Sequence, residues 1–142
     1  MHILVPVDGS ASANRAVAHA LLLAHGLSDT RITLLNVQNQ QTLDTSDVSS
    51  ITSVGANTER AVDQSKKALH QAIQLCRNAH VKFDTRSAYG PIGETIGKIA
   101  RESAADQIVM GTRGFSSWQG MVLGSVSTKV IQLSLVPVTL VK

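Results

Sequence analysis

The first ten residues restrict the fold more than any other part of the sequence. Residues Ile3–Val7 form a short apolar run, and Asp8, Gly9 and Ser10 close it. A continuous apolar run, without alternating polar residues, is typical of a strand that is covered on both faces. We therefore expect Ile3–Val7 to be the central strand of a sheet that has helices on both sides.

A helix is predicted directly after this strand. Apolar residues recur from Ala13 onward with the helical period, and Gly26 is placed to end the helix. Either Ser10 or Ser12 can cap the first turn. A second strand-like run, Ile32–Val37, follows after a short connection. A strand, a helix and a strand in this order require a right-handed crossover between parallel strands, so we predict a parallel sheet.

The alternation of strand and helix continues to the end of the sequence. The remaining predicted elements are a helix over Glu59–His80, an edge strand over Val81–Tyr89, a helix with Pro91 in its first turn, a strand over Gln107–Met110, a helix after Gly124 that contains Val126, Val130, Ile131 and Leu133, and a strand over Val136–Val141. The polar stretch from Gln38 to about Thr58 is predicted to be a long loop. Five strands and four helices predict one open α/β sheet in a single domain that spans residues 1–142.

Composition excludes several classes of function. The net charge is +3, but the basic residues are scattered and Lys66-Lys67 is the only adjacent pair, so we expect no nucleic-acid surface. No signal peptide is recognisable and no segment approaches the roughly 20 apolar residues of a membrane span, which favours a cytoplasmic protein without membrane contact. The single cysteine, Cys76, has no second thiol to pair with and is predicted to lie in a helix core.

The strongest functional signal is a set of glycines in the last third of the chain. Gly111 and Gly114 are followed, after nine intervening residues, by Gly124 and Ser125. The set starts where a predicted strand ends and finishes where a helix begins. Glycine lets backbone amides approach a phosphate, and a helix amino terminus adds about half a positive charge, so the pattern predicts a polyphosphate site. The alternative is that these glycines only form turns. The pattern is not a Walker-type phosphate loop, because no lysine precedes Ser125.

Four side chains near these turns each have a functional and a structural interpretation. Asp8, at the carboxyl end of the central strand, can accept ribose hydroxyls or hold Mg²⁺ against phosphates, or it can form a plain Asp-Gly turn. Ser125 can donate to a phosphate or cap the last helix. Arg113 can pair with phosphate or be solvated. Trp118 is assigned to packing and not to the site.

Metal binding and acyl transfer receive no support from the sequence. The histidines show no metal-ligand spacing with the cysteine or with carboxylates; they are His2, His19, His25, His70 and His80. No serine stands in a Gly-x-Ser-x-Gly motif, and no histidine is placed by the sequence beside a hydroxyl with a third orienting group. We therefore predict neither a zinc site nor a nucleophilic enzyme.

Taken together, these motifs resemble the universal stress protein family, of the ATP-binding type. The resemblance covers nearly the whole chain and rests on Ile3–Ser10, Gly90-Pro91, Ala105–Gly111, the Gly-2x-Gly-9x-Gly-Ser pattern and Pro137-Val138. It implies a Rossmann-like, doubly wound sheet of the adenine nucleotide alpha hydrolase type with strand order 3-2-1-4-5. The chain departs from many members between the second and third glycines, where residues 115–123 contain no basic residue.

The resemblance also implies a site for ATP, ADP or AMP. By position, Asp8 would lie beside the ribose and phosphates, Val37 would offer backbone groups to the adenine edge, and the glycines would surround the phosphates, with Mg²⁺ near Asp8. The residues implied to bind the nucleotide are Pro6, Val7, Asp8, Val37, Met110, Gly111, Arg113, Gly114, Gly124, Ser125, Val126 and Ser127.

Three functions are compatible with the sequence. The leading hypothesis is an ATP-binding stress sensor or regulator with at most slow hydrolysis, because a phosphate site is present without a recognisable base. The second is a nucleotide-free dimeric interaction protein, in which the long loop or Trp118 contacts a partner. The third, an ATP-dependent transferase, ranks last because the His-x-Gly-His and lysine-rich loops of such enzymes are absent. A homodimer through the late strand Val136–Val141 is expected, because an apolar sheet edge favours pairing with a second copy.

Overall fold

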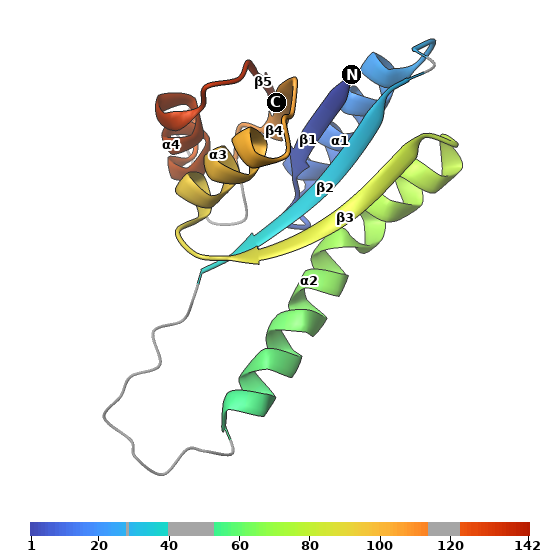
Figure 1. Ribbon diagram of the computed structural model, residues 1–142. Coiled ribbons are helices and arrows are strands. Elements are labelled where there is room, and N and C mark those ends of the chain that lie inside the picture. The colour runs from blue at the N-terminus through green and yellow to red at the C-terminus, as the bar shows by residue number, and fades with distance from the viewer. Residues whose placement is uncertain (28, 40–52, 114–122) are drawn as a thin grey trace.

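Five parallel strands form the middle layer of the protein (Figure 1). The structure is a computed structural model that describes residues 1–27, 29–39, 53–113 and 123–142. The strands are β1 (His2–Pro6), β2 (Arg31–Gln38), β3 (Lys82–Tyr89), β4 (Gln107–Gly111) and β5 (Val138–Val141). Their spatial order is β3-β2-β1-β4-β5 and every neighbouring pair is parallel. The predicted fold, with its central first strand and exposed third strand at an edge, is confirmed.

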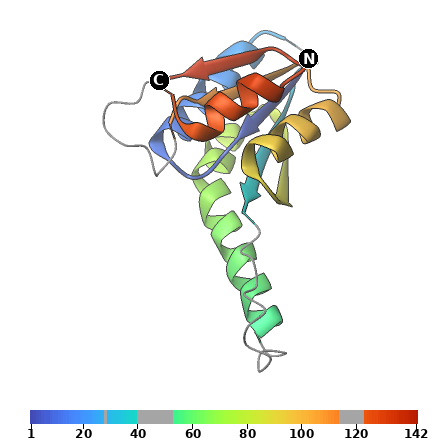
Figure 2. The ribbon, with the colours of Figure 1, turned by 90° about the vertical axis from the view of Figure 1, so that its left-hand side faces the viewer.

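Two helices cover each face of the sheet (Figure 2). The helices are α1 (Ala11–Ala24), α2 (Ser53–Asn78), α3 (Ile92–Glu102) and α4 (Ser125–Leu133). The first two pack on one face and the last two on the other. The amino-terminal half of α2 extends beyond the sheet, as both ribbon views show. None of the helices in the described ranges is long and apolar enough to span a membrane.

The central strand is buried on both faces, which explains its continuous apolar run. Ile3 and Val5 belong to the cluster under α1 and α2, whereas Leu4 belongs to the cluster under α3 and α4. None of the three has any exposed surface. Burial of each such side chain contributes about 1.5–3 kcal/mol. On the α1 side, fully buried alanines such as Ala16 and Ala20 let the helix approach the sheet closely.

The first helix begins at one of the two predicted cap residues. Ser10 is the N-cap, and its hydroxyl oxygen accepts a hydrogen bond from the Ala13 amide at 3.1 Å. Ser12 lies inside the helix and is buried. The helix ends before Gly26, which has a φ of +82° and so adopts the left-handed conformation that glycine favours.

Several predicted boundaries are wrong. The segment Gln38 to about Thr58 is not all loop, because β2 includes Gln38 and α2 begins at Ser53; residues 40–52 lie outside the described residues. Extending an existing helix costs little, since each added residue gains a hydrogen bond, so α2 continues into the polar segment. Pro91 is the N-cap of α3 instead of a first-turn residue.

The carboxyl-terminal segment exposes two apolar residues of α4. Ile131 and Leu133, which the sequence places in this helix, are 44% and 42% exposed. Ser127 and Val130 are the buried residues of this short helix, and Val126 packs partly buried against the second core cluster. The last strand starts at Val138 and not at Val136. It is an edge strand, paired with β4 alone.

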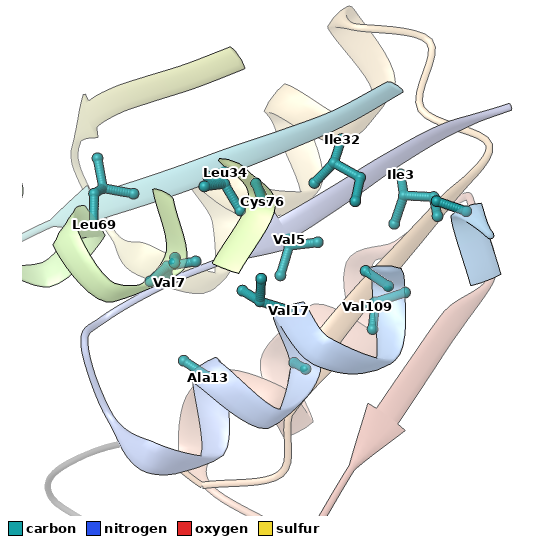
Figure 3. Packing of buried hydrophobic residues seen from close by; sticks show 14 residues of the cluster. Ile3, Val5, Val7, Ala13, Val17, Ile32, Leu34, Leu69, Cys76 and Val109 are labelled. Carbon is teal, nitrogen blue, oxygen red and sulfur yellow. The ribbon is translucent and has the colours of Figure 1, made fainter. Parts of the chain in front are cut away.

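Cys76 is fully buried in the cluster between α2 and the sheet (Figure 3). Burial raises the pKa of its thiol from 9.0 to about 11, because the thiolate would lose its hydration. The folded state therefore holds the proton more tightly than the unfolded state does. This contribution to stability is fully present below pH 9 and is lost as the pH rises from 9 toward 11.

We predict that the Cys76 thiol reacts with an aromatic disulfide reagent only as fast as the native protein unfolds. We also expect the unfolding free energy of the wild type to fall more steeply than that of Cys76→Ala above pH 9. Denaturant titrations of both proteins across this range measure the difference, since other titrating groups are common to both. Immediate labelling of the native protein would contradict the buried position.

Candidate functional site

The direction of chain winding reverses between β1 and β4. These strands are neighbours in the sheet, but β1 continues into α1 on one face, whereas the next helix after β4 is α4 on the other face. In open α/β sheets a crevice forms at the carboxyl ends of two such strands. The predicted site residues of both strands lie along this edge, because Pro6 ends β1 and Gly111 ends β4, directly after the buried Met110.

A hydrogen bond within the turn after β1 holds the Asp8 side chain. Val7 is buried, and its amide donates to the Leu35 carbonyl oxygen at 2.7 Å, so the chain follows β2 for one more residue. Asp8 is exposed, and its Oδ1 accepts from the Ser10 amide at 2.9 Å. Gly9 has a φ of +87°. The Asp-Gly turn is therefore present, but it uses one oxygen, and no group in the described part of the chain donates to Oδ2.

A cavity of about 440 Å³ lies at the carboxyl ends of β1 and β2, beneath α2. Ligand pockets for small molecules have volumes of about 300–1,000 Å³. The described residues that line it come from the turn after β1, the end of β2 and one side of α2, namely Asp8, Gly9, Asn36, Val37, Gln38, Gln64, Lys67 and Ala68. The structure thus brings Asp8 and Val37, predicted from distant segments, into one cavity wall.

Two side-chain amides connect the cavity wall to the backbone. Asn36 is buried, and its Nδ2 donates to the Val7 carbonyl oxygen at 2.8 Å. Gln38 donates from Nε2 to the Asn36 Oδ1 at 3.2 Å and to the Ala61 carbonyl oxygen of α2 at 2.8 Å. Sequence reasoning missed both residues. The available signal was a polar Asn36 inside the apolar run that precedes Val37.

Gly111 is required by packing between β4 and α1. A Cβ atom at this position would lie 2.8 Å from the carbonyl carbon of Ser12 and 2.9 Å from its Cβ. Real Cβ atoms do not approach other atoms so closely, so α1 can pass β4 at this distance only over a glycine. The Ser12 hydroxyl has no hydrogen-bond partner among the described residues. The Ser12 side chain therefore lies against the Gly111 backbone.

The start of α4 is attached to the end of β4 by three hydrogen bonds. The Gly124 amide donates to the Thr112 carbonyl oxygen at 2.7 Å, and the Ser127 hydroxyl lies 3.1 Å from the carbonyl oxygens of both Gly111 and Thr112. The Ser127 side chain therefore holds the helix in place. Its hydroxyl is already committed to the backbone and is not directed to a ligand.

Ser125 does not cap α4, so that interpretation is wrong. The N-cap is Gly124, which has no side chain to accept from the first amides, and its backbone is extended with φ −74° and ψ 160°. The first amides of a helix have no acceptor within the helix. Those of Ser125, Val126 and Ser127 are consequently suited to an anion at this end. The Ser125 side chain is exposed, whereas Val126 is partly buried against the second core cluster.

The remaining predicted positions are less informative. Arg113 is exposed at the end of the described segment. Gly114 and Trp118 lie outside the described residues, so the middle of the glycine pattern stays a prediction. In the parts of the chain that the structure describes, no three histidine, cysteine or acidic side chains gather as metal ligands.

Comparison with known proteins gives one consistent result. The model of the universal stress protein family matches residues 1–142. Universal stress protein YxiE of Bacillus subtilis is 32% identical over 148 residues, which cover 99% of this chain and 97% of that protein. The structure of UspA from Lactobacillus plantarum has a TM-score of 0.81 at 26% identity and covers 100% of this chain and 97% of its own. A universal stress protein solved in complex with cAMP has a TM-score of 0.68 at 25% identity, covering 99% and 95%.

We predict that Gly111→Ala lowers the unfolding free energy by about 1–3 kcal/mol, because the added methyl group overpacks the contact with Ser12. Gly97→Ala is the matched control. Gly97 lies within helix α3, and a Cβ atom there would be 3.9 Å from Leu133 of α4, an ordinary contact distance. Alanine also restricts the unfolded chain more than glycine does, so this change should raise the unfolding free energy by up to about 1 kcal/mol. Denaturant unfolding of both variants measures the two effects. Equal stability of Gly111→Ala and wild type would contradict the close packing.

Proposed function

Because the chain belongs to the universal stress protein family, we propose that it binds an adenine nucleotide and acts as a nucleotide-dependent regulator in the response to stress. The observation that carries the proposal is the cavity where Asp8 and Val37 meet at the carboxyl edge of the sheet. The solved family member that contains cAMP supports the choice of an adenine nucleotide for a chain with the same fold.

In the proposed complex the nucleotide lies along the edge from β2 to α4. The base occupies the cavity beside Val37, and the ribose hydroxyls donate to the free oxygen of Asp8. The phosphates accept from the amides at the start of α4, where the helix dipole favours negative charge. Gly124 matters in this arrangement because it adds no side chain between these amides and the anion.

The residues fit Mg²⁺ as a companion of a triphosphate. Asp8 is exposed and keeps one carboxylate oxygen that no described residue occupies. One carboxylate together with phosphate oxygens and water is a usual ligand set for Mg²⁺. When bound, the ion would neutralise phosphate charge, while the chain supplies the Asp8 oxygen and the α4 amides.

We propose ATP as the main ligand, with ADP and AMP bound through the same base and ribose contacts. Turnover should be slow, because efficient phosphoryl transfer needs a group that orients the attacking nucleophile. Asp8 is the one carboxylate among the described residues of the cavity, and it lies on the ribose side of the proposed complex. Regulation would then follow nucleotide occupancy and not product formation.

We predict that Gly124→Val weakens ATP binding at least about tenfold, because its side chain would fill the space of the phosphates. The backbone angles at Gly124 suit any residue, so a loss of binding would not reflect a strained turn. Calorimetric titration of nucleotide-stripped protein measures the affinity. Unchanged affinity in this variant would exclude the α4 amides as the phosphate site, and no binding to the wild type would contradict the proposed function.

Asp8→Asn separates charge from shape in the same titration. The asparagine oxygen can still accept from the Ser10 amide, so the turn is kept while the negative charge is removed. We expect its ATP affinity to depend much less on Mg²⁺ than that of the wild type. Equal Mg²⁺ dependence in both proteins would show that Asp8 is not the metal ligand.

We further propose that the protein is a homodimer through the segment Val136–Val141. Strand β5 has a hydrogen-bonded neighbour on one side only, and its residues are half-buried. Leu135, directly before this segment, is 79% exposed, and Ile131 and Leu133 add apolar surface on α4. A second copy that pairs at this edge would satisfy the unpaired backbone groups and cover the apolar side chains.

We predict that Leu135→Glu and Val138→Lys both shift the protein from dimer to monomer, because each places a charge in the proposed interface. Leu135 is exposed and contributes little to the core, so the Leu135→Glu substitution should not itself unfold the protomer. Sedimentation velocity over a wide concentration range measures the assembly state. A wild type that remains monomeric throughout would exclude this interface.

A further inference from the structure

The orientation of the Gln38 side chain is determined by backbone carbonyl groups. The Val7 carbonyl oxygen can only accept, so the group of Asn36 that faces it at 2.8 Å must be the amide nitrogen. The Asn36 oxygen then faces Gln38 at 3.2 Å and requires a donor there. Independently, the Ala61 carbonyl oxygen at 2.8 Å requires a donor from the same Gln38 group. Two separate constraints thus place the Gln38 nitrogen on the same side.

This arrangement leaves the Oε1 atom of Gln38 as an acceptor on a side chain that lines the cavity. Both hydrogens of its Nε2 are engaged, one by Asn36 and one by Ala61. Its Oε1 receives no hydrogen bond from any group in the described ranges, and Gln38 lines the cavity next to Val37. Turning the amide over would bring its oxygen against the Asn36 and Ala61 oxygens, which costs both hydrogen bonds. The side chain therefore cannot adapt freely to a ligand that presents another acceptor.

Purine bases differ at the group that such an acceptor would meet. Adenine carries an exocyclic amino group, which donates, whereas hypoxanthine and guanine carry a carbonyl oxygen at the same ring position. A fixed acceptor binds the amino group and repels the carbonyl oxygen. We propose that Gln38, held by Asn36 and Ala61, is a specificity residue that selects adenine over 6-oxopurines. This inference rests on the proposed function, since it assigns a role in recognition of the base.

The other polar residues of the cavity are less suited to this role. The Gln64 and Lys67 side chains project from α2 and are exposed, and Lys67 lies 3.8 Å from Asp63 on its own helix. No hydrogen bond to a described residue fixes the Gln64 amide, so it can turn to suit either purine. Gln64 consequently provides a matched control on the opposite wall of the same cavity.

The test compares the affinities of AMP and IMP, which differ at this exocyclic group and at the neighbouring N1, an acceptor in adenine and a donor in hypoxanthine. Wild type, Gln38→Met and Gln38→Lys are titrated calorimetrically with both nucleotides. Methionine removes the acceptor and keeps the length of the side chain, whereas lysine removes the acceptor, keeps donors for Asn36 and Ala61 and adds a positive charge that is the same toward AMP and IMP. If one variant folds poorly, the other still carries the test. Gln64→Met is the control.

We expect the wild type to prefer AMP and both Gln38 variants to have an AMP-to-IMP affinity ratio about tenfold lower. The variants lose the hydrogen bond to the amino group of AMP, and they also lose the repulsion of the carbonyl oxygen of IMP. Gln64→Met should keep the wild-type ratio. An AMP-to-IMP ratio that is the same in wild type and in the Gln38 variants would overturn the inference and leave adenine-nucleotide binding intact. A wild type that binds neither nucleotide would contradict the proposed function itself, and this inference with it.

Discussion

Strand β1 is paired on both sides, and its side chains are buried on both faces. Its backbone pairs with β2 and β4, while Ile3 and Val5 face one core cluster and Leu4 faces the other. A strand in that position forces the following chain to cross over one face or the other. Because α1 and α4 take opposite faces, the edge where β1 and β4 end is not covered by either helix. The location of the candidate site therefore follows from the same burial that stabilises the fold.

The polar groups at this edge perform two different tasks. Some hold the elements together, as the Gly124 amide and the Ser127 hydroxyl do when they attach α4 to the end of β4. Others have no partner among the residues that the structure describes, namely the second oxygen of Asp8 and the first amides of α4. The amide pair Asn36 and Gln38 does both, since its nitrogen atoms connect the turn after β1, the strand β2 and the helix α2. The Gln38 oxygen is thereby held in one orientation, on a residue that lines the cavity.

Much of the fold could be predicted because the responsible interactions are local. The continuous apolar run of β1 and the cap at Ser10 identify the first strand and helix, and the exposed β3 follows from its alternation. The start of α2 could not be predicted, since its polar first turns carry no apolar period. The exposure of Ile131 and Leu133 depends on how little of the sheet α4 covers, which periodicity does not encode.

Some residues of the candidate site could likewise be predicted from the sequence, whereas others could not. Asp8 could be predicted from its place at a strand end and Val37 from the family resemblance, and the structure brings them together. For Gly111 the sequence favoured a ligand, whereas the structure adds a contact with Ser12, a residue distant in the chain that only the tertiary fold brings near. The role of Gln38 depends on the Ala61 carbonyl group of α2, so no pattern within β2 alone could reveal it.

Mapping of amide resonances during titration with AMP tests the central claim most directly, because it reports both ends of the nucleotide in one experiment. We expect the amides of Gly9, Val37 and Gln38, on the base and ribose side, and those of Ser125 and Val126, on the phosphate side, all to shift with a single affinity. Shifts that are confined to one of these groups, or that occur around β5 instead, would contradict a nucleotide that spans the edge from β2 to α4.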